Sequence, residues 1–206
     1  MKEPPATLVE TFLGYLQQGG FVMYPLVGAT FVLWYMIGYR ALTLQRGSVR
    51  SVRALMRKWD EGELKRPTGI IDSAVVMAGE LARRYPTQLR HALDDAFAGF
   101  ERDLRQGRVL ITSIVVTAPL LGLLGTVTGM IETFESLGEM TLYTQGGGIA
   151  GGISQALFTT QMGLVVAVPG VVIGRLLDRR QQRIEEDLAK IKDIACARAH
   201  ERRSAT

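Results

Sequence analysis

Three long stretches of the 206-residue chain carry no charged side chain: residues 11–39, 109–131 and 140–174. All 24 Lys and Arg residues and all 20 Asp and Glu residues lie outside them. The overall hydrophobic content of 47% is also typical of soluble proteins. The class of protein is therefore indicated by where the charged residues fall along the chain. An apolar stretch of about 18 or more uncharged residues is a candidate transmembrane helix. The sequence therefore predicts an all-α membrane protein with three transmembrane helices. It excludes an ordinary soluble globule and a disordered chain.

We place the three spans at residues 21–39, 109–131 and 153–174. At about 1.5 Å per residue, each is long enough to cross a hydrocarbon layer of ~30 Å. Trp34 and Tyr35 lie toward the end of the first span, where amphipathic rings suit the lipid headgroup region. Arg40 ends that span. The single Cys196 excludes an internal disulfide.

The distribution of cations predicts the orientation. Residues 40–108 hold fourteen Lys and Arg and residues 175–206 hold nine, whereas 1–10 hold one and 132–139 none. Cations favour the cytoplasmic side. We therefore expect the N-terminus outside, 40–108 as a cytoplasmic helical loop, 132–152 as an outside loop and 175–206 as a cytoplasmic tail. No basic region precedes the first span, which predicts a retained anchor.

The outside segment 1–20 contains Thr7 and Glu10 at capping-box spacing, followed by apolar residues on one helical face. This pattern predicts an interfacial helix over residues 7–18. The alternative is a simple extension of the first span.

Helical spacing also organises the cytoplasmic segments. We expect a helix over 70–84, then a long helix capped by Thr87 that continues through Gly107 into the second span. The third span should run straight on into the tail, which keeps an apolar stripe. Such long helices bury little by themselves, so we expect several copies to pack side by side.

The spans contain no Asp, Glu, Lys, Arg or His, so the chain alone lacks the titratable group that a membrane proton pathway normally needs. No metal, phosphate-loop or nucleophile–base motif is visible, and we expect no enzyme activity, catalytic residue, metal or cofactor. His91 and His200 fall in polar segments and read as solvated side chains. The cytoplasmic cation excess follows from topology, because Arg and Glu interleave at helical spacing, and it does not predict nucleic-acid binding.

Small and hydroxyl residues gather on one face of each of the last two spans. At 100° per residue, Thr112, Pro119, Gly122 and Thr126 fall within about 80° of one another. In the third span an arc of about 100° holds a longer set, namely Gly152, Ala156, Thr159, Thr160, Gly163, Ala167, Gly170 and Gly174. Such faces let helices approach closely in lipid. Either they only pack helices, or the threonines Thr126 and Thr160 also line a lumen.

Two runs carry a family resemblance. TAPLLGLLGTVTGMIETF over residues 117–134 and GGISQALFTTQMGLVVAVPGVVIGRLLDR over residues 151–179 resemble the signature of the ExbB/TolQ/MotA proton-channel family. The three-span layout with an outside N-terminus is similar to the ExbB and TolQ branch. The resemblance covers about residues 105–185 most strongly.

The resemblance implies a homo-oligomer in the bacterial inner membrane, a pentamer, whose second and third spans line a central lumen. A single-span partner of the ExbD/TolR type would insert a helix carrying an essential Asp. In the ExbB branch the resulting motion passes to a TonB-like protein and energises outer-membrane transport.

The family's lumen threonines fall on Thr126 and Thr160, and its prolines on Pro119 and Pro169. We expect Thr112, Gln155 and Thr159 to join the lumen lining. The two prolines and six glycines should pack helices, namely Pro119, Gly122, Gly125, Gly129, Gly163, Pro169, Gly170 and Gly174.

One position departs from the family pattern. Relatives usually carry Glu five residues before the third-span threonine, where this chain has Gln155. Glutamine does not titrate, so the proton carrier should be the partner's Asp.

The expected function is therefore a proton-channel, or stator, subunit of an inner-membrane motor. The alternatives are a TolQ-like subunit for envelope integrity and a passive membrane scaffold. A solute carrier is disfavoured because three spans show no internal repeat.

Overall fold

The computed structural model describes residues 19–45, 47, 51–62, 69–85, 88–139 and 147–204, together with Gly14 and Leu16. Every regular element among these residues is a helix. The predicted interfacial helix over 7–18 lies almost wholly outside the described residues.

Three of the helices are long and apolar enough to cross a membrane. They are α2 (Gly20–Thr43), α6 (Arg108–Glu139) and α7 (Gly147–Ser204), and each contains one of the predicted spans. The described chain divides into two units. Unit 1 comprises residues 1–37 and 109–174, which closely follow the uncharged stretches, and unit 2 comprises residues 38–108 and 175–206.

Unit 2 contains three shorter helices, α3 (Val52–Asp60), α4 (Ile70–Arg84) and α5 (Leu89–Arg105). Ser51 caps α3, because its side chain accepts a hydrogen bond from the Ala54 N–H at 3.4 Å. The predicted helix over 70–84 is confirmed at both ends by α4. Trp59 of α3 lies against Gly79 of α4, and the Arg83 guanidinium stacks 4.6 Å from the centre of its ring.

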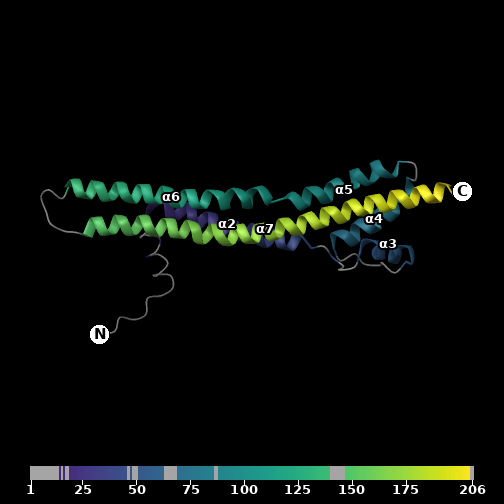
Figure 1. Cartoon of the computed structure of the whole chain (residues 1–206), viewed down its shortest axis with the longest axis horizontal. Helices are drawn as coiled ribbons and strands as arrows, with labels where there is room; N and C mark the ends of the chain where they lie inside the picture. Colours follow the sequence, from purple (N-terminus) through teal and green to yellow (C-terminus); the bar gives the residue numbers. More distant parts are fainter. Residues whose placement is uncertain are drawn as a thin grey trace, which may run out of the picture. The chain divides into compact units, whose positions relative to one another are not determined.

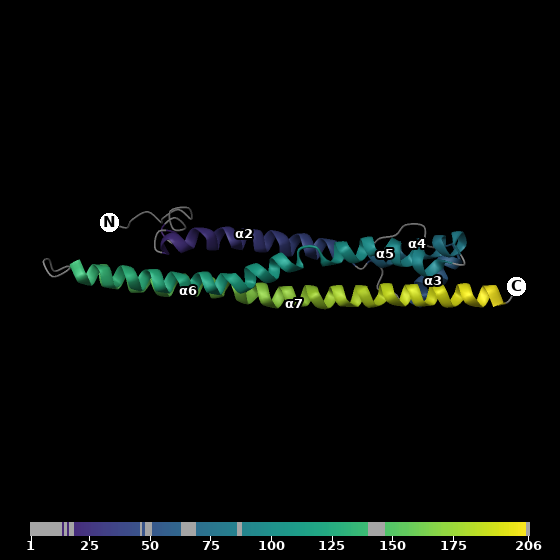
Figure 2. The ribbon, with the colours of Figure 1, turned by 90° about the horizontal axis from the view of Figure 1, so that it is seen from above.

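Helix α7 is continuous from the third span into the tail, as expected, and its ribbon can be followed over its whole length in Figure 1 and over the tail in Figure 2. The predicted apolar stripe of the tail is buried inside the chain's own unit 2. Its members are Leu177, Ile184, Leu188, Ile191 and Ala195. Helix α5 contributes the fully buried Leu93 and Phe97 to the same unit. This stripe is therefore covered within one chain, and the expectation that several copies pack side by side stays a prediction.

The second long helix differs from the prediction. The expected continuous helix from the loop into the second span is interrupted between α5 and α6, as Figure 1 shows. Gln106 is extended, with ψ 134°, and Gly107 has φ +78°. That left-handed conformation suits glycine and ends an α-helix. Helix α5 begins after Gln88, which makes no side-chain cap, and Thr87 lies outside the described residues.

Charged side chains attach the last turns of α2 to the rest of unit 2. Arg40 is 2% exposed, and its guanidinium donates to Asp178 at 2.9 Å and to the Gln181 side-chain oxygen. Arg108 also approaches Asp178, at 3.4 Å. A buried cation needs such partners, because the desolvation of an unpaired charge is costly. Helix α2 itself continues past the paired Arg40 to Thr43.

We predict that Gly79→Ala destabilises unit 2. A Cβ at Gly79 would overlap the Trp59 ring, so the cost of overpacking, about 1–3 kcal/mol, should exceed the helix-propensity gain of about 1 kcal/mol. Gly99→Ala is the matched control, because a Cβ there meets nothing within 4 Å and the variant should be slightly stabilised. Thermal unfolding of the purified protein in detergent measures both. Equal melting temperatures would contradict the packing.

A second prediction concerns Lys192. Burial alone lowers its pKa, but hydrogen bonds to Asp94 at 2.9 Å and Glu101 at 3.3 Å outweigh burial and raise it. The pKa of Asp94 is lowered, chiefly by the hydrogen bond that Lys192 donates and next by the positive charge of Lys192. The stabilisation from Asp94 is present above its ordinary pKa of 3.8 and is lost as the pH falls through its lowered pKa.

Lys192→Met should therefore lower the melting temperature at neutral pH. On acidification, the melting temperature of this variant should fall by less than that of the wild type. The Lys192 contribution is present below its ordinary pKa of 10.5 and disappears as the pH rises through the raised value. Lys190→Met is the control, because Lys190 is 59% exposed and only reaches Asp187 at 3.5 Å. Parallel pH profiles for the wild type and Lys192→Met would refute the pairing.

Candidate functional site

The backbones of α6 and α7 approach each other closely in unit 1, where Figure 1 shows the two helices side by side. A Cβ at Gly129 would lie 2.8 Å from the Gly152 carbonyl oxygen, and one at Gly163 would lie 2.8 Å from the Ala118 carbonyl oxygen. A Cβ at Gly122 would lie 3.1 Å from the Thr159 carbonyl oxygen. A Cβ does not fit at 2.8 Å from a backbone atom, and at 3.1 Å the neighbouring backbone would have to shift by a few tenths of an ångström. The glycines are therefore required by helix packing.

Two threonines fill the space that other glycines leave. Thr159 is 2% exposed and lies where a Cβ on Gly125 would overlap its side chain. Thr133 is 3% exposed and lies against Gly152 in the same way. Their hydroxyls donate within their own helices, from Thr159 to the Gln155 carbonyl at 3.1 Å and from Thr133 to the Gly129 carbonyl at 2.8 Å.

The structure thus places Thr159 between the helices and not on an open face. Thr133 was missed from the sequence, because it lies beyond the predicted end of the second span. A signal existed, since Thr133 follows Gly129 by one helical turn and shares its face.

Helix α2 covers one side of the α6–α7 pair. Gly170 of α7 faces both other helices, because a Cβ there would lie 2.6 Å from Val115 of α6 and 3.1 Å from Leu33 of α2. Gly174 is less crowded, with Ile111 at 3.6 Å from its added Cβ. The predicted packing glycines therefore meet neighbouring helices along the length of the predicted spans.

Thr126 and Thr160 lie on the same side of the pair. Each is three residues from a contact glycine, Gly129 or Gly163, and so about 60° from the contact direction at 100° per residue. The helices run antiparallel, so equal rotations carry both residues to one side. Thr160 donates to the Gly122 carbonyl at 3.2 Å, and Thr126 donates to the Leu123 carbonyl at 2.6 Å. The structure brings these two predicted lumen residues to one face.

Thr112 belongs to this face as well, because it is exposed and lies about 80° from Gly122 in the same rotational sense. Pro119 is half-buried on the same side of α6, and Pro169 is half-buried in α7. A proline within a helix leaves the carbonyl one turn earlier without its usual N–H partner. The face formed by Thr112, Thr126 and Thr160 is called the threonine face below.

Gln155 lies on the other side of the pair. Five residues separate it from Thr160, which is about 140° of helical rotation. Its carboxamide reaches the start of α2, where a Cβ on Gly20 would overlap the Gln155 Nε2 atom. Gly20 has φ +60°, so its lack of a side chain serves both the turn and this contact. Within one chain, Gln155 does not share a face with the two threonines.

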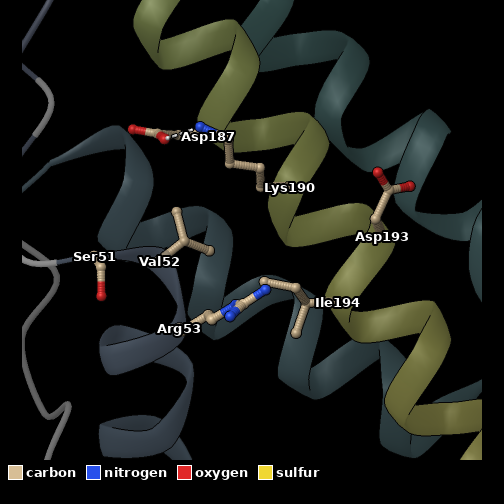
Figure 3. Close-up of a pocket in the computed structure, with 7 residues that line it drawn as sticks. All are labelled: Ser51, Val52, Arg53, Asp187, Lys190, Asp193 and Ile194. Carbon is tan, nitrogen blue, oxygen red and sulfur yellow. Dashed lines mark hydrogen bonds and ion pairs between the residues drawn. The ribbon is translucent and has the colours of Figure 1, made fainter.

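A separate groove of about 550 Å³ lies in unit 2. Figure 3 shows its lining residues from the start of α3 and from α7, which are Ser51, Val52, Arg53, Asp187, Lys190, Asp193 and Ile194. Lys190 and Asp187 pair with each other at 3.5 Å across one wall. The groove shares no lining residue with the threonine face and is not part of the candidate site.

In the part of the chain that the structure describes, no group of three or more His, Cys, Asp or Glu side chains could hold a metal ion. Over the predicted spans, the polar groups of the unit 1 helices include hydroxyls, carbonyls and the carboxamides of Gln155 and Gln161. This donor set suits hydrogen bonding to another polypeptide or to water within a membrane.

The comparison with known proteins agrees with this architecture. The profile of the MotA/TolQ/ExbB proton channel family matches residues 69–190, which include α4, α5, α6 and the threonine face. The chain belongs to this family of membrane transport proteins.

The curated relatives are named as biopolymer transport proteins. Putative biopolymer transport protein ExbB-like 1 of Synechocystis is 33% identical over 86% of this chain and 75% of its own length. Putative ExbB-like 3 of the same organism is 42% identical over 40% of each chain. Biopolymer transport protein exbB1 of Vibrio cholerae is 42% identical over 40% of this chain and 38% of its own. The chain thus spans about two fifths of the length of two of these three relatives.

We predict that Gly129→Ala disrupts the α6–α7 contact. The added methyl would meet the backbone of Gly152, which cannot rotate away, so we expect a loss of about 1–3 kcal/mol. Gly28→Ala in α2 is the control, because a Cβ there meets nothing within 4 Å. Melting temperatures in detergent report the difference. A fully stable Gly129→Ala protein would show that the backbones are farther apart than described.

Proposed function

We propose that this chain is the proton-channel, or stator, subunit of an inner-membrane motor that converts proton motive force into mechanical work. The observation that carries the proposal is the threonine face, where Thr126 and Thr160 meet on one side of a tightly packed helix pair. Membership of the MotA/TolQ/ExbB proton channel family supports it.

The lumen residues in this proposal are Thr126, Thr160 and Thr112. Copies of the chain form a homo-oligomer, a pentamer by resemblance, with the threonine face turned toward the central lumen. Thr159 and Gln155 serve the packing of α6 against α7 and of α7 against α2. The N-terminus lies in the periplasm and the tail of α7 in the cytoplasm.

The proton carrier is an Asp on a single-span partner of the ExbD/TolR type. The hydroxyl hydrogens of both threonines are engaged in hydrogen bonds to the backbone. Thr126 donates to the Leu123 carbonyl, and Thr160 donates to the carbonyls of Gly122 and Ala156. Each hydroxyl oxygen retains acceptor lone pairs. The face is therefore suited to accept a hydrogen bond from the protonated form of a carboxylic acid.

The client is a TonB-like protein that energises outer-membrane transport. The names of the curated relatives, all biopolymer transport proteins of the ExbB type, favour this client over envelope maintenance of the TolQ type. Moving one charge through 100 mV releases about 2.3 kcal/mol, so several protons would drive one working cycle.

We predict that Thr126→Val and Thr160→Val each abolish proton-driven transport while leaving the protein in the membrane. Valine keeps the shape of threonine and removes the oxygen. Thr30→Val in α2 is the matched control, because Thr30 also donates to a carbonyl of its own helix, that of Leu26 at 2.8 Å. Complementation of a deletion strain, with membrane levels measured by immunoblot, gives the readout. Wild-type transport in both variants would refute the lumen assignment.

Dissipating the proton gradient distinguishes the motor hypothesis from the alternative of a passive scaffold. A protonophore should stop transport at unchanged protein levels if the chain is a motor subunit. Transport that survives the protonophore would favour the scaffold. In sealed vesicles the chain alone should not acidify the interior under a voltage, since its predicted spans hold no Asp, Glu, Lys, Arg or His.

A further inference from the structure

Charged and polar side chains from several helices form one connected network in unit 2. The end of α2, the junction of α5 and α6, and the part of α7 that follows the third predicted span all contribute to it. The six residues are called the boundary network below, and they are Arg40, Arg105, Arg108, Asp178, Gln181 and Glu185.

The two carboxylates of the network each pair with an arginine beside the helix break. Asp178 lies 3.4 Å from Arg108 and also accepts a hydrogen bond from Arg40 at 2.9 Å. Glu185 lies 3.8 Å from Arg105. Arg105 is the last residue of α5 and Arg108 is the first residue of α6. The two ion pairs therefore hold the chain to α7 on both sides of the break.

Gln181 joins the two ion pairs into one network. Its side chain is 3% exposed, its oxygen accepts a hydrogen bond from Arg40, and its nitrogen donates to Glu185 at 2.8 Å. An amide accepts and donates at once, whereas a carboxylate does not donate and an ammonium group does not accept. Gln181 is thus the residue at which the network can be cut without removing a charge.

The spacing of the two ion pairs matches a broken helix. The two carboxylates are seven residues apart on α7, which is about 10.5 Å along its axis. The two arginines are three residues apart, which would be only about 4.5 Å along a continuous helix. The extended Gln106 and the left-handed Gly107 lengthen this stretch of chain. Closing the break would shorten it by up to about 6 Å and pull against one of the two ion pairs.

Apart from Gly107, the pattern of buried residues around the break suits one continuous helix. Phe97, Leu104, Ile111 and Ala118 are each at most 2% exposed and recur every seven residues across the break. Seven residues complete nearly two turns, so a continuous helix would keep all four on one face. It would also give intrahelical partners to the first N–H groups of α6, which lack them at a helix start. The network opposes these two gains.

We infer that the boundary network is a latch that holds the α5–α6 junction broken against the continuous helix that its sequence favours. Gly107 is the hinge, because glycine adopts its φ of +78° without strain. Releasing the latch allows Gln106 and Gly107 to enter a helix that runs from α5 into α6. In the proposed motor, on which this last step rests, transport requires the latched junction, because a junction that switches freely would absorb the movement.

Hydrogen exchange on the purified full-length protein in lipid nanodiscs tests the latch. Gln181→Met cuts the network, keeps a side chain of similar volume, and leaves each carboxylate paired with an arginine. The N–H groups of residues 108–110 should then exchange roughly tenfold more slowly, because they gain helical partners. Gln182→Met is the matched control, since Gln182 is adjacent and exposed, and it should exchange as the wild type does.

A substitution at the hinge should give the same shift by a different route. Gly107→Ala disfavours the positive φ angle and favours a helix, so it should slow exchange of the same N–H groups. Gly99→Ala is the control within α5, because it raises helix propensity away from the junction and its Cβ meets nothing within 4 Å. Exchange at the junction should be unchanged in this control.

The outcomes separate the latch from the proposed function. Unchanged exchange in either Gln181→Met or Gly107→Ala overturns the latch. Faster exchange in Gln181→Met also overturns it, because the network would then only stabilise the junction. Slower exchange with wild-type transport in the complementation assay overturns the link to the motor and leaves the latch. Loss of transport in Gln181→Met, with Gln182→Met active at equal membrane levels, supports that link. Wild-type transport that survives a protonophore overturns the proposed function and leaves the exchange result standing.

Discussion

The close approach of the α6 and α7 backbones is the contact on which the rest of unit 1 depends. In lipid, apolar side chains gain nothing by leaving the hydrocarbon for one another, so helices associate through dispersion contacts and hydrogen bonds. Both need short distances. The glycines at 122, 129 and 163 supply them, and Thr159 and Thr133 fill the gaps with side chains whose hydroxyls are satisfied internally. The rotation of this contact then decides which residues face outward.

Unit 2 is built on different principles. Its apolar stripe on α7 is buried by the chain's own helices, and ion pairs such as Arg40–Asp178 and Lys192–Asp94 surround it. Exposed pairs of this kind contribute little, but Arg40 is buried and its removal would leave Asp178 dependent on Arg108. The two units thus place small residues and charges in separate parts of the sequence, which is why the charge pattern alone reveals the division.

Much of this fold follows from the sequence, and the misses have physical causes. The ends of α4 and the continuity of α7 follow from helical spacing and from flanking glycine and proline. The break at Gly107 depends on a single positive φ angle, which spacing does not indicate. The contact of Trp59 with Gly79 joins residues of two helices, and local patterns carry no information about it. Helical spacing alone places Gln155 about 140° from Thr160, on a different face of α7. The family resemblance nevertheless led to the prediction that both residues line the lumen.

In the proposed mechanism the proton-carrying acid belongs to a partner, and the neutral threonine face then has a thermodynamic consequence. A fixed positive charge beside a carboxyl group would lower its pKa and hold it ionised, whereas a fixed negative charge would hold it protonated. Hydroxyls do neither, so both protonation states of a partner's Asp remain accessible during a cycle. The absence of Asp, Glu, Lys, Arg and His from the predicted spans is therefore a property that the proposed mechanism needs.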